Sequence, residues 1–140
     1  MALQQGATDA FKTGLMNGGY NFTSGSFKMA LYTGSATLGP STAVYTSTNE
    51  VVATGYTAGG IALPVSVAPT SSNNITYISF SNVTWYGSIT ARGALIYKDL
   101  GGGSTASVCV LDFGSDKTSV NTFVVQFPSS TYSTAILRIV

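Results

Sequence analysis

Ala94-Leu-Ile-Tyr97 and Val108-Cys-Val-Leu111 are the two stretches of this sequence that decide its fold. Each is a continuous apolar run of strand length, without the alternation of apolar and polar residues that marks a strand with one solvated face. Strands that are covered on both faces have this composition. A glycine-rich loop from Leu100 to Thr105 joins the two runs. We therefore expect them to lie in the middle of a β-sheet.

The segments around this centre have the length and pattern of further strands. Residues 27–32 and 75–80 alternate with a period of two, as a half-buried strand does. Between residues 80 and 83 the pattern slips by one residue, so that Val83 and Trp85 carry the apolar face, which is how a β-bulge looks in sequence. Four further strands are expected at residues 50–54, 61–68, 123–127 and 135–140, with Pro64 interrupting the second of these. Turns are expected at residues 69–74 and 113–121.

A short helix precedes the strands. Thr8 is a good N-cap residue, Asp9 follows in the first turn, and Phe11 and Leu15 lie four residues apart on one helix face. The pair Gly18-Gly19 then ends the helix. About eight or nine short strands with closely spaced turns favour an all-β fold, an antiparallel β-sandwich of jelly-roll type with one short N-terminal helix. The 140 residues are expected to form one domain, with residues 1–25 as an N-terminal arm.

The segment from Thr33 to Thr48 is rich in Gly, Ser and Thr, contains Pro40, and is expected to be a long loop. Loops of this length are uncommon unless they have a function. Two interpretations remain open: an arm that contacts a partner, or a surface excursion without a specific role.

The composition excludes several classes of partner. Only 8% of the residues are charged, against about 25% in an ordinary soluble domain, and the net charge is +1. We therefore expect no binding to nucleic acid or to an anionic membrane surface. The sequence contains no run near the ~18 apolar residues of a membrane span and no basic and apolar secretory signal, so synthesis in the cytoplasm is expected. A near-neutral surface rich in Ser, Thr and Tyr suits a protein that packs against other proteins.

The chemistry of catalysis is sparse. The chain has no histidine, which removes the usual general base, the Ser-His-Asp and Cys-His arrangements and nearly all zinc sites. The single cysteine, Cys109, lies among apolar residues and is expected to be an inert core thiol. Asp112 and Asp116 are expected to flank a turn, with capping favoured over a calcium ion. Arg92 is expected to bond Asp112 or the backbone. We expect no enzymatic activity and no cofactor.

The tyrosines leave two interpretations open. Four of the eight stand in expected loops: Tyr45, Tyr56, Tyr86 and Tyr132. Such side chains can stack on sugar rings or fill a protein interface. Alternatively, they cover the edges of the sandwich core.

Five motifs in order resemble a known family: Phe27-Lys-Met-Ala-Leu-Tyr-Thr33, Gly55-Tyr-Thr-Ala-Gly-Gly60, Val83-Thr-Trp85, Ala91-Arg-Gly-Ala-Leu-Ile-Tyr97 and Val110-Leu-Asp-Phe-Gly-Ser-Asp-Lys117. The series is similar to the small head-decoration, or cement, proteins of tailed bacteriophages, and it extends over most of the chain. This resemblance implies a jelly-roll-like fold, no catalysis, self-association as a homodimer, and binding to the major capsid protein on the exterior of the virion.

Two hypotheses of function follow. The first is a structural virion protein that cements the capsid, and the alternative is a carbohydrate-binding module or phage tail adhesin. Candidate interface residues come from the helix, from two loops and from the glycine-rich loop: Phe11, Leu15, Tyr45, Tyr56 and Gly102.

Overall fold

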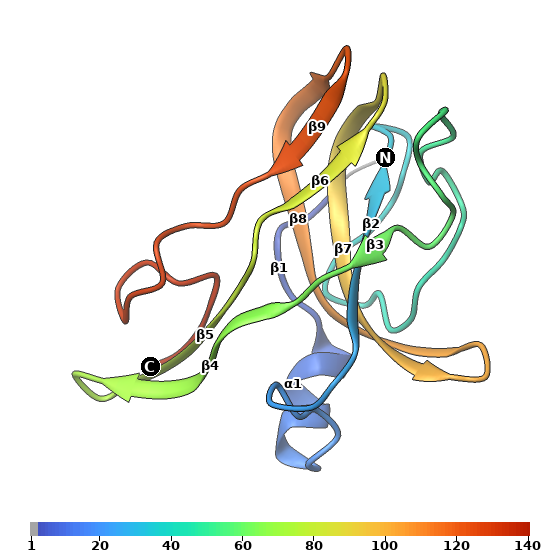
Figure 1. Cartoon of the computed structure of the whole chain (residues 1–140). Coiled ribbons are helices and arrows are strands. Elements are labelled where there is room, and N and C mark those ends of the chain that lie inside the picture. The colour runs from blue at the N-terminus through green and yellow to red at the C-terminus, as the bar shows by residue number, and fades with distance from the viewer. Residues whose placement is uncertain (1–2) are drawn as a thin grey trace.

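A computed structural model describes residues 3–140 as an antiparallel β structure with one short helix (Figure 1). The elements are β1 (Gly6–Ala7), α1 (Asp9–Met16), β2 (Phe27–Tyr32), β3 (Ile61–Ala62), β4 (Val65–Ser72), β5 (Ile75–Phe80), β6 (Val83–Tyr86), β7 (Thr90–Gly101), β8 (Ser104–Thr118), β9 (Thr122–Val125) and β10 (Leu137–Ile139).

The larger layer is a five-stranded sheet in the order β1-β8-β7-β2-β3. Strand β7 is its central strand and pairs with β8 through Leu95 with Val110 and Ile96 with Cys109. These four residues are at most 3% exposed. The prediction that the two continuous apolar runs form the middle of a sheet is therefore confirmed, and the physical reason is that both faces of these strands are covered.

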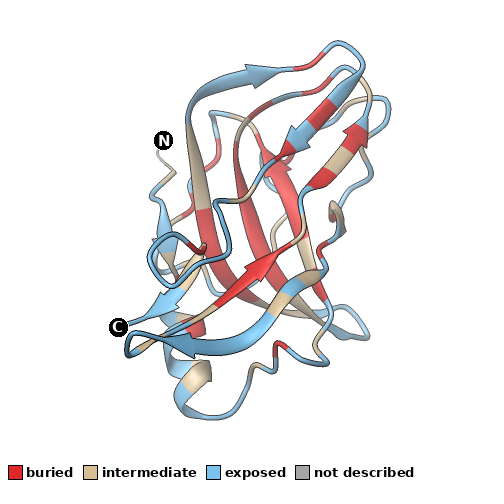
Figure 2. Cartoon of the chain, turned by 60° about the vertical axis from the view of Figure 1, so that its left-hand side comes forward, coloured by how far each residue is buried: buried red, intermediate tan, exposed pale blue. Residues whose placement is uncertain are grey.

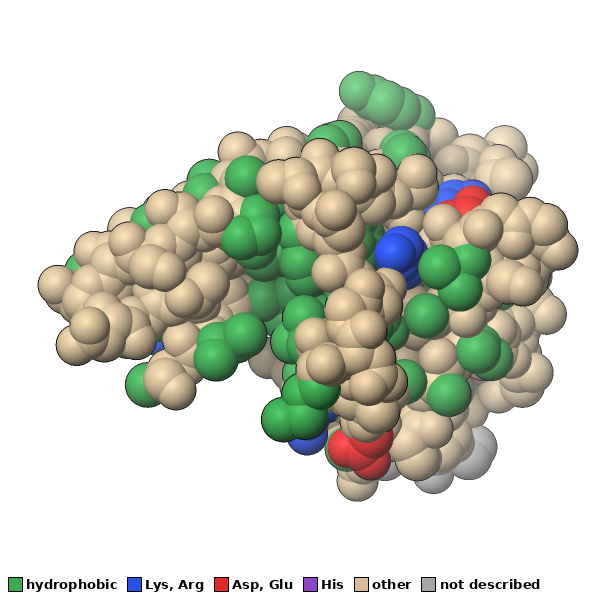
Figure 3. Space-filling view, turned by 90° about the horizontal axis from the view of Figure 1, so that it is seen from below, with side chains coloured by type: hydrophobic (Ala, Val, Ile, Leu, Met, Phe, Trp, Pro, Cys, Tyr) green, Lys and Arg blue, Asp and Glu red, His purple; other side chains and the backbone are tan. Residues whose placement is uncertain are grey.

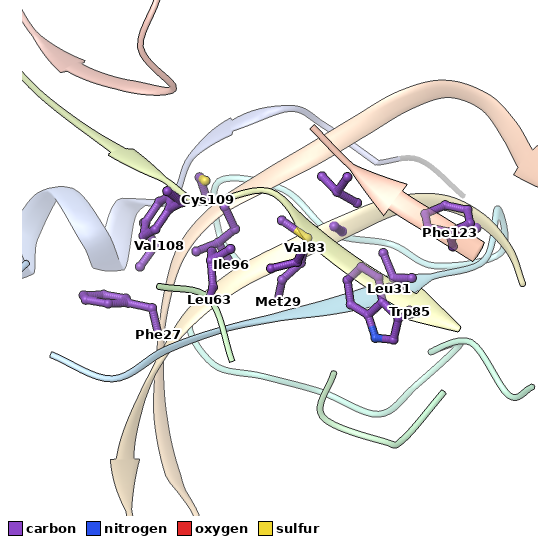
Figure 4. Close-up of a cluster of buried hydrophobic side chains, with 14 of the residues drawn as sticks. Phe27, Met29, Leu31, Leu63, Val83, Trp85, Ile96, Val108, Cys109 and Phe123 are labelled. Atoms are coloured by element: carbon purple, nitrogen blue, oxygen red, sulfur yellow. The ribbon is translucent and has the colours of Figure 1, made fainter. Parts of the chain in front are cut away.

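The second layer consists of two smaller sheets, β10-β5-β4 and β6-β9. Their inner faces pack on the five-stranded sheet and enclose the main core (Figure 4). Met29, Leu31 and Ile96 come from the large sheet, whereas Val83, Trp85 and Phe123 come from β6 and β9. This arrangement confirms the all-β, antiparallel sandwich. The jelly-roll connectivity stays a prediction.

The outer face of the large sheet is covered by the chain itself. Tyr32, Leu95 and Val110 form a second buried cluster together with Ala36 and Leu38 from the long loop. Both loop residues are at most 2% exposed. The segment from residue 33 to 48 thus supplies part of the core through these two residues, and contact of its exposed part with a partner stays a prediction. Figure 2 shows the buried stretches gathered in the middle of the long strands and the exposed ones at the hairpin tips and in β4.

The expected signals for the helix are confirmed. Thr8 is the N-cap and its Oγ1 accepts a hydrogen bond from the Phe11 amide at 3.2 Å. At the other end, Gly18 has φ +75° and donates to the Leu15 carbonyl, while Gly19 donates to the Gly14 carbonyl at 2.7 Å. These two bonds form a Schellman motif, in which glycine takes the left-handed position that a Cβ would strain.

Several strand boundaries differ from the sequence predictions. Residues 51–54 form no strand, and Glu50 makes only an isolated bridge to Tyr32. Pro64 does interrupt its segment, which divides into β3 and β4. The slip before Val83 is not a bulge, because there the chain leaves one small sheet and enters the other.

The expected turns are also partly wrong. Strand β4 continues to Ser72, so the turn contracts to Asn73 and Asn74, which have φ of +50° and +64°. Strand β8 continues to Thr118 because Thr118 and Lys117 pair with the start of β7. Asp112 and Asp116 therefore lie within one strand and do not flank a turn.

Candidate interaction surface

A groove runs along one open edge of the sandwich, between α1 and the strands β5 and β10. It has a volume of about 610 Å³. Figure 3 views this end of the molecule from below and shows hydrophobic side chains gathered in the hollow. We call this feature the α1–β10 groove. Its lining includes Phe11, Leu15, Tyr20, Ile78, Leu137 and Ile139.

The two walls are apolar because each element places one periodic face toward the groove. Phe11 and Leu15 lie on one face of α1, and both pack on the main core. On the opposite wall, Leu137 pairs with Ile78 and Ile139 pairs with Thr76, so the two apolar residues of β10 share a face. The exposed fraction of the side chain rises from 5% at Ile78 of β5 to 59% at Ile139 of β10, so the groove is open to solvent at Ile139.

Tyr20 closes the groove beside the helix. Gly14 permits this position, because a Cβ there would lie 2.2 Å from the Tyr20 ring. The Tyr20 hydroxyl donates to the Ser107 carbonyl of β8 at 2.6 Å, and burial raises the pKa of that hydroxyl. The Lys98 ammonium lies 5.8 Å from the ring centroid and donates to the Gly19 carbonyl. This side of the groove is thereby fixed.

The charges lining the groove are of one sign. Lys12 and Arg138 contribute to its lining, and none of its described lining residues is Asp or Glu. The Lys12 ammonium lies 3.6 Å from the Asp9 carboxylate in an exposed i,i+3 pair. Arg138 donates through Nη1 to the Ser133 carbonyl at 2.7 Å, which leaves further guanidinium donors for other partners.

Exposed apolar side chains continue from both walls. Met16, which follows Leu15, is 92% exposed, and Val140, which follows Ile139, is 95% exposed. Large hydrophobic residues at such exposure beside an apolar groove mark a surface suited to contact with another protein.

Two of the four tyrosines expected in loops, Tyr45 and Tyr56, belong to a different feature, a cluster around the Glu50 carboxylate, whereas Tyr86 lies in β6 and Tyr132 lies between β9 and β10. Glu50 is 7% exposed and accepts three hydrogen bonds: from the Tyr45 hydroxyl at 2.5 Å, from the Tyr56 hydroxyl at 2.5 Å and from the Gly59 amide at 2.7 Å. The Tyr56 hydroxyl also accepts from the Leu31 amide of β2 at 2.9 Å. We call these groups the Glu50 cluster.

A further tyrosine, Tyr97, supports this cluster. Tyr97 stacks on Tyr45 with ring centroids 5.1 Å apart and donates to the Gly59 carbonyl at 2.6 Å. Burial, and then the charge of Glu50, raises the pKa of Tyr97 to about 12. Burial and the hydrogen bond to Glu50 also raise the pKa of Tyr45 and of Tyr56 well above the usual value. These hydroxyls stay protonated and act as fixed donors that hold two loops together.

The structure separates the predicted interface residues. Phe11 is 6% exposed and forms the base of the α1–β10 groove, whereas Leu15 lines its wall. Tyr45 and Tyr56 belong to the Glu50 cluster, and Gly102 lies exposed in the turn between β7 and β8. Their contact with a partner stays a prediction.

Sequence reasoning missed the strand side of the groove and the role of Glu50. The alternation of Leu137 and Ile139 was a signal for an apolar strand face. No local signal could show that this face lies opposite α1, because the two elements are far apart in the chain.

The remaining polar candidates have structural partners. Arg92 Nε donates to Asp112 Oδ1 at 3.0 Å, which confirms the expected pair. The Gly114 amide and Arg92 lower the pKa of Asp112. No group of three or more His, Cys, Asp or Glu residues that could hold a metal ion occurs among residues 3–140. Cys109 is buried, which confirms the expected core thiol, and burial raises the pKa of this thiol to about 12.

None of the helices among residues 3–140 is long and apolar enough to cross a membrane. Comparisons with known protein families, with curated proteins and with solved structures found no match to this chain. The α1–β10 groove and its charges are therefore the observations from which a function can be argued.

Proposed function

We propose that this chain is a structural virion protein that decorates and cements the outside of a bacteriophage capsid, binds the major capsid protein and associates with itself as a homodimer. The observation that carries this proposal is the α1–β10 groove, an open apolar groove with a volume of about 610 Å³ on a chain with few charges. The series of motifs that resembles phage cement proteins supplies the identity of the partner.

The distribution of polar groups supports binding over catalysis. The described lining of the groove contains no carboxylate, its two charged residues are both cations, and the chain has no histidine. The buried carboxylate of Glu50 is bonded to hydroxyls and an amide of its own chain. Multiple copies on a repeating shell gain affinity by multivalency, so modest contacts per copy suffice.

The proposal is tested by sedimenting the purified chain with purified phage capsids. We expect the chain to travel with the capsids at a fixed ratio, and we expect capsids that lack it to lose their DNA or shape at a lower temperature. Capsids that neither bind the chain nor contain it in the mature particle would contradict the proposed function.

The alternative, a carbohydrate-binding module or tail adhesin, is supported by two exposed tyrosines, Tyr86 and Tyr132, the second of which is 37% exposed. Tyr86 is 75% exposed and lines a shallow pocket of about 250 Å³ with Trp85 and Gly55. Tyr45 and Tyr56 no longer support it, because their hydroxyls are bonded to Glu50. Binding to a glycan array, together with no binding to capsids, would favour this alternative.

A further inference from the structure

We propose that the α1–β10 groove receives an extended strand of a different protein, which pairs with the free edge of β10 and carries alternating apolar and acidic side chains. The occupant is thus defined by its backbone conformation, by its side-chain period and by its charge. Only the identification of the donor as the major capsid protein rests on the proposed function.

The free edge supplies the backbone partners. Strand β10 is the end strand of the order β10-β5-β4, and among residues 3–140 it pairs with β5 alone. A strand edge of this kind presents unpaired amide and carbonyl groups to an incoming strand. The opposite edge of the same sheet is less suitable, because β4 contains Pro69 and two register shifts.

The groove supplies the side-chain contacts. Leu137 and Ile139 face it from β10, and Leu15 faces it from α1. A strand added beside β10 continues the small sheet, so every second side chain of the added strand points into the groove. We expect apolar side chains at these groove-facing positions of the added strand, because they would displace water from Leu15 and Ile139. The added strand would complete the sandwich where the second layer ends at β10.

The charges define the remaining positions and disfavour the two-fold pairing of β10 with β10 of a second copy of this chain. Arg138 alternates with Leu137 and Ile139 along β10, and this cation favours acidic side chains at the alternate positions of the added strand, whereas Lys12, which also lines the groove, is already paired with Asp9. In a two-fold pairing of β10 with β10 of another copy, centred on Arg138, the two Arg138 side chains would lie directly opposite. Like charges in that position destabilise a strand pair.

The test uses the full chain and two short synthetic peptides, one of alternating valine and glutamate and one of alternating valine and lysine. Amide chemical shifts are followed by NMR during titration. We expect the glutamate peptide to shift the amides of β10 and α1, and the lysine peptide to bind about tenfold more weakly, equivalent to about 1.4 kcal/mol. Lys12→Glu combined with Arg138→Glu should reverse this preference. A misfolded variant could not produce such a reversal.

A matched pair of variants locates the site. Ile139→Asp should abolish binding of the glutamate peptide, since it removes an apolar contact and adds a negative charge in the groove. Val120→Asp makes the same change in charge at a residue that is 80% exposed and outside the groove, and it should bind as the unmodified chain does. Ile139 is itself 59% exposed, so its substitution should leave the fold intact.

Three results with the peptides would overturn the inference. These are no shift with either peptide, equal binding of both peptides, or shifts confined to other parts of the chain. A dimer in analytical ultracentrifugation that Ile139→Asp dissociates would show that a second copy occupies the groove, and would also overturn it. Capsid binding that persists in Ile139→Asp refutes the groove as the capsid site and leaves the proposed function intact, whereas peptide binding without capsid binding refutes the proposed function alone.

Discussion

Two edges of this sandwich differ in what fills the space between the layers. At the β2–β3 edge the loop of residues 51–60 enters between the layers, with Val51 and Tyr56 packed on the main core. This loop bonds β2 through the Tyr56 hydroxyl and approaches β6 so closely that a Cβ on Gly55 would lie 2.0 Å from the Tyr86 carbonyl oxygen. At the β10 edge the corresponding space is the α1–β10 groove.

This difference shows how the chain divides stability and binding. The β2–β3 edge, which we call the closed edge, is fixed by the buried Glu50 carboxylate. This carboxylate accepts hydrogen bonds from groups of its own chain, so the polar groups of the edge are satisfied without a partner. The β10 edge, which we call the open edge, exposes to solvent both apolar side chains and the unpaired side of strand β10. Changes at the closed edge should therefore alter folding, and changes at the open edge should alter binding.

The largest effect is expected from Glu50→Ala. This change leaves the hydroxyls of Tyr45 and Tyr56 and the Gly59 amide without their acceptor, and we expect a loss of about 3 kcal/mol in the free energy of unfolding. Urea denaturation measures it. Glu50→Gln, which retains one acceptor oxygen, should lose less, and Asp9→Ala, a change at an exposed carboxylate, should lose almost nothing. A loss for Glu50→Ala as small as that for Asp9→Ala would show that the cluster does not close this edge.

High pH should open the same edge. The folded state raises the pKa of Tyr45 and of Tyr56 above the usual value near 10, so the unfolded chain releases these protons first. The stability that these hydroxyls contribute is complete below pH 10 and falls as pH rises beyond it. Tyr56→Phe should cost about 1 kcal/mol at pH 7 and should show a shallower decline above pH 10.

The unmodified chain is the control for the pH profile of Tyr56→Phe. The Cys109 thiol, whose pKa is raised to about 12, contributes a decline of the same sign, and the unmodified chain and Tyr56→Phe both retain it. Identical pH profiles for the two proteins would exclude the Tyr56 hydroxyl as a source of the alkaline transition.

The centre of the fold was predictable from sequence because its signals are local. The run Ala94–Tyr97 has no polar position, and only a strand buried on both faces tolerates that composition. Thr8 and the pair Gly18-Gly19 mark the helix ends through bonds to residues within one or two turns. In each case the sequence neighbours that carry the signal also form the structure.

The edges were not predictable because they depend on distant partners. The polar segment after Asp112 has the composition of a turn, yet it continues as a strand since Lys117 and Thr118 pair with β7. Glu50 shows no local sign of burial although its donors Tyr45, Tyr56 and Gly59 are near in the chain, because they converge on it only where the loop packs against β2 and the core. The groove likewise depends on α1 and β10, which stand at opposite ends of the chain.

The smallest effect is expected at the open edge. Ile139→Ala should change the free energy of unfolding by no more than about 0.5 kcal/mol, because the side chain is 59% exposed. Its counterpart at the closed edge is Val51→Ala, at a side chain that is 5% exposed, and this change should cost about 2 kcal/mol although it removes fewer carbon atoms. Urea denaturation of the two variants compares the edges directly. An equal loss would mean that Ile139 already serves the core of the isolated chain, and the β10 edge would then need no partner to complete it.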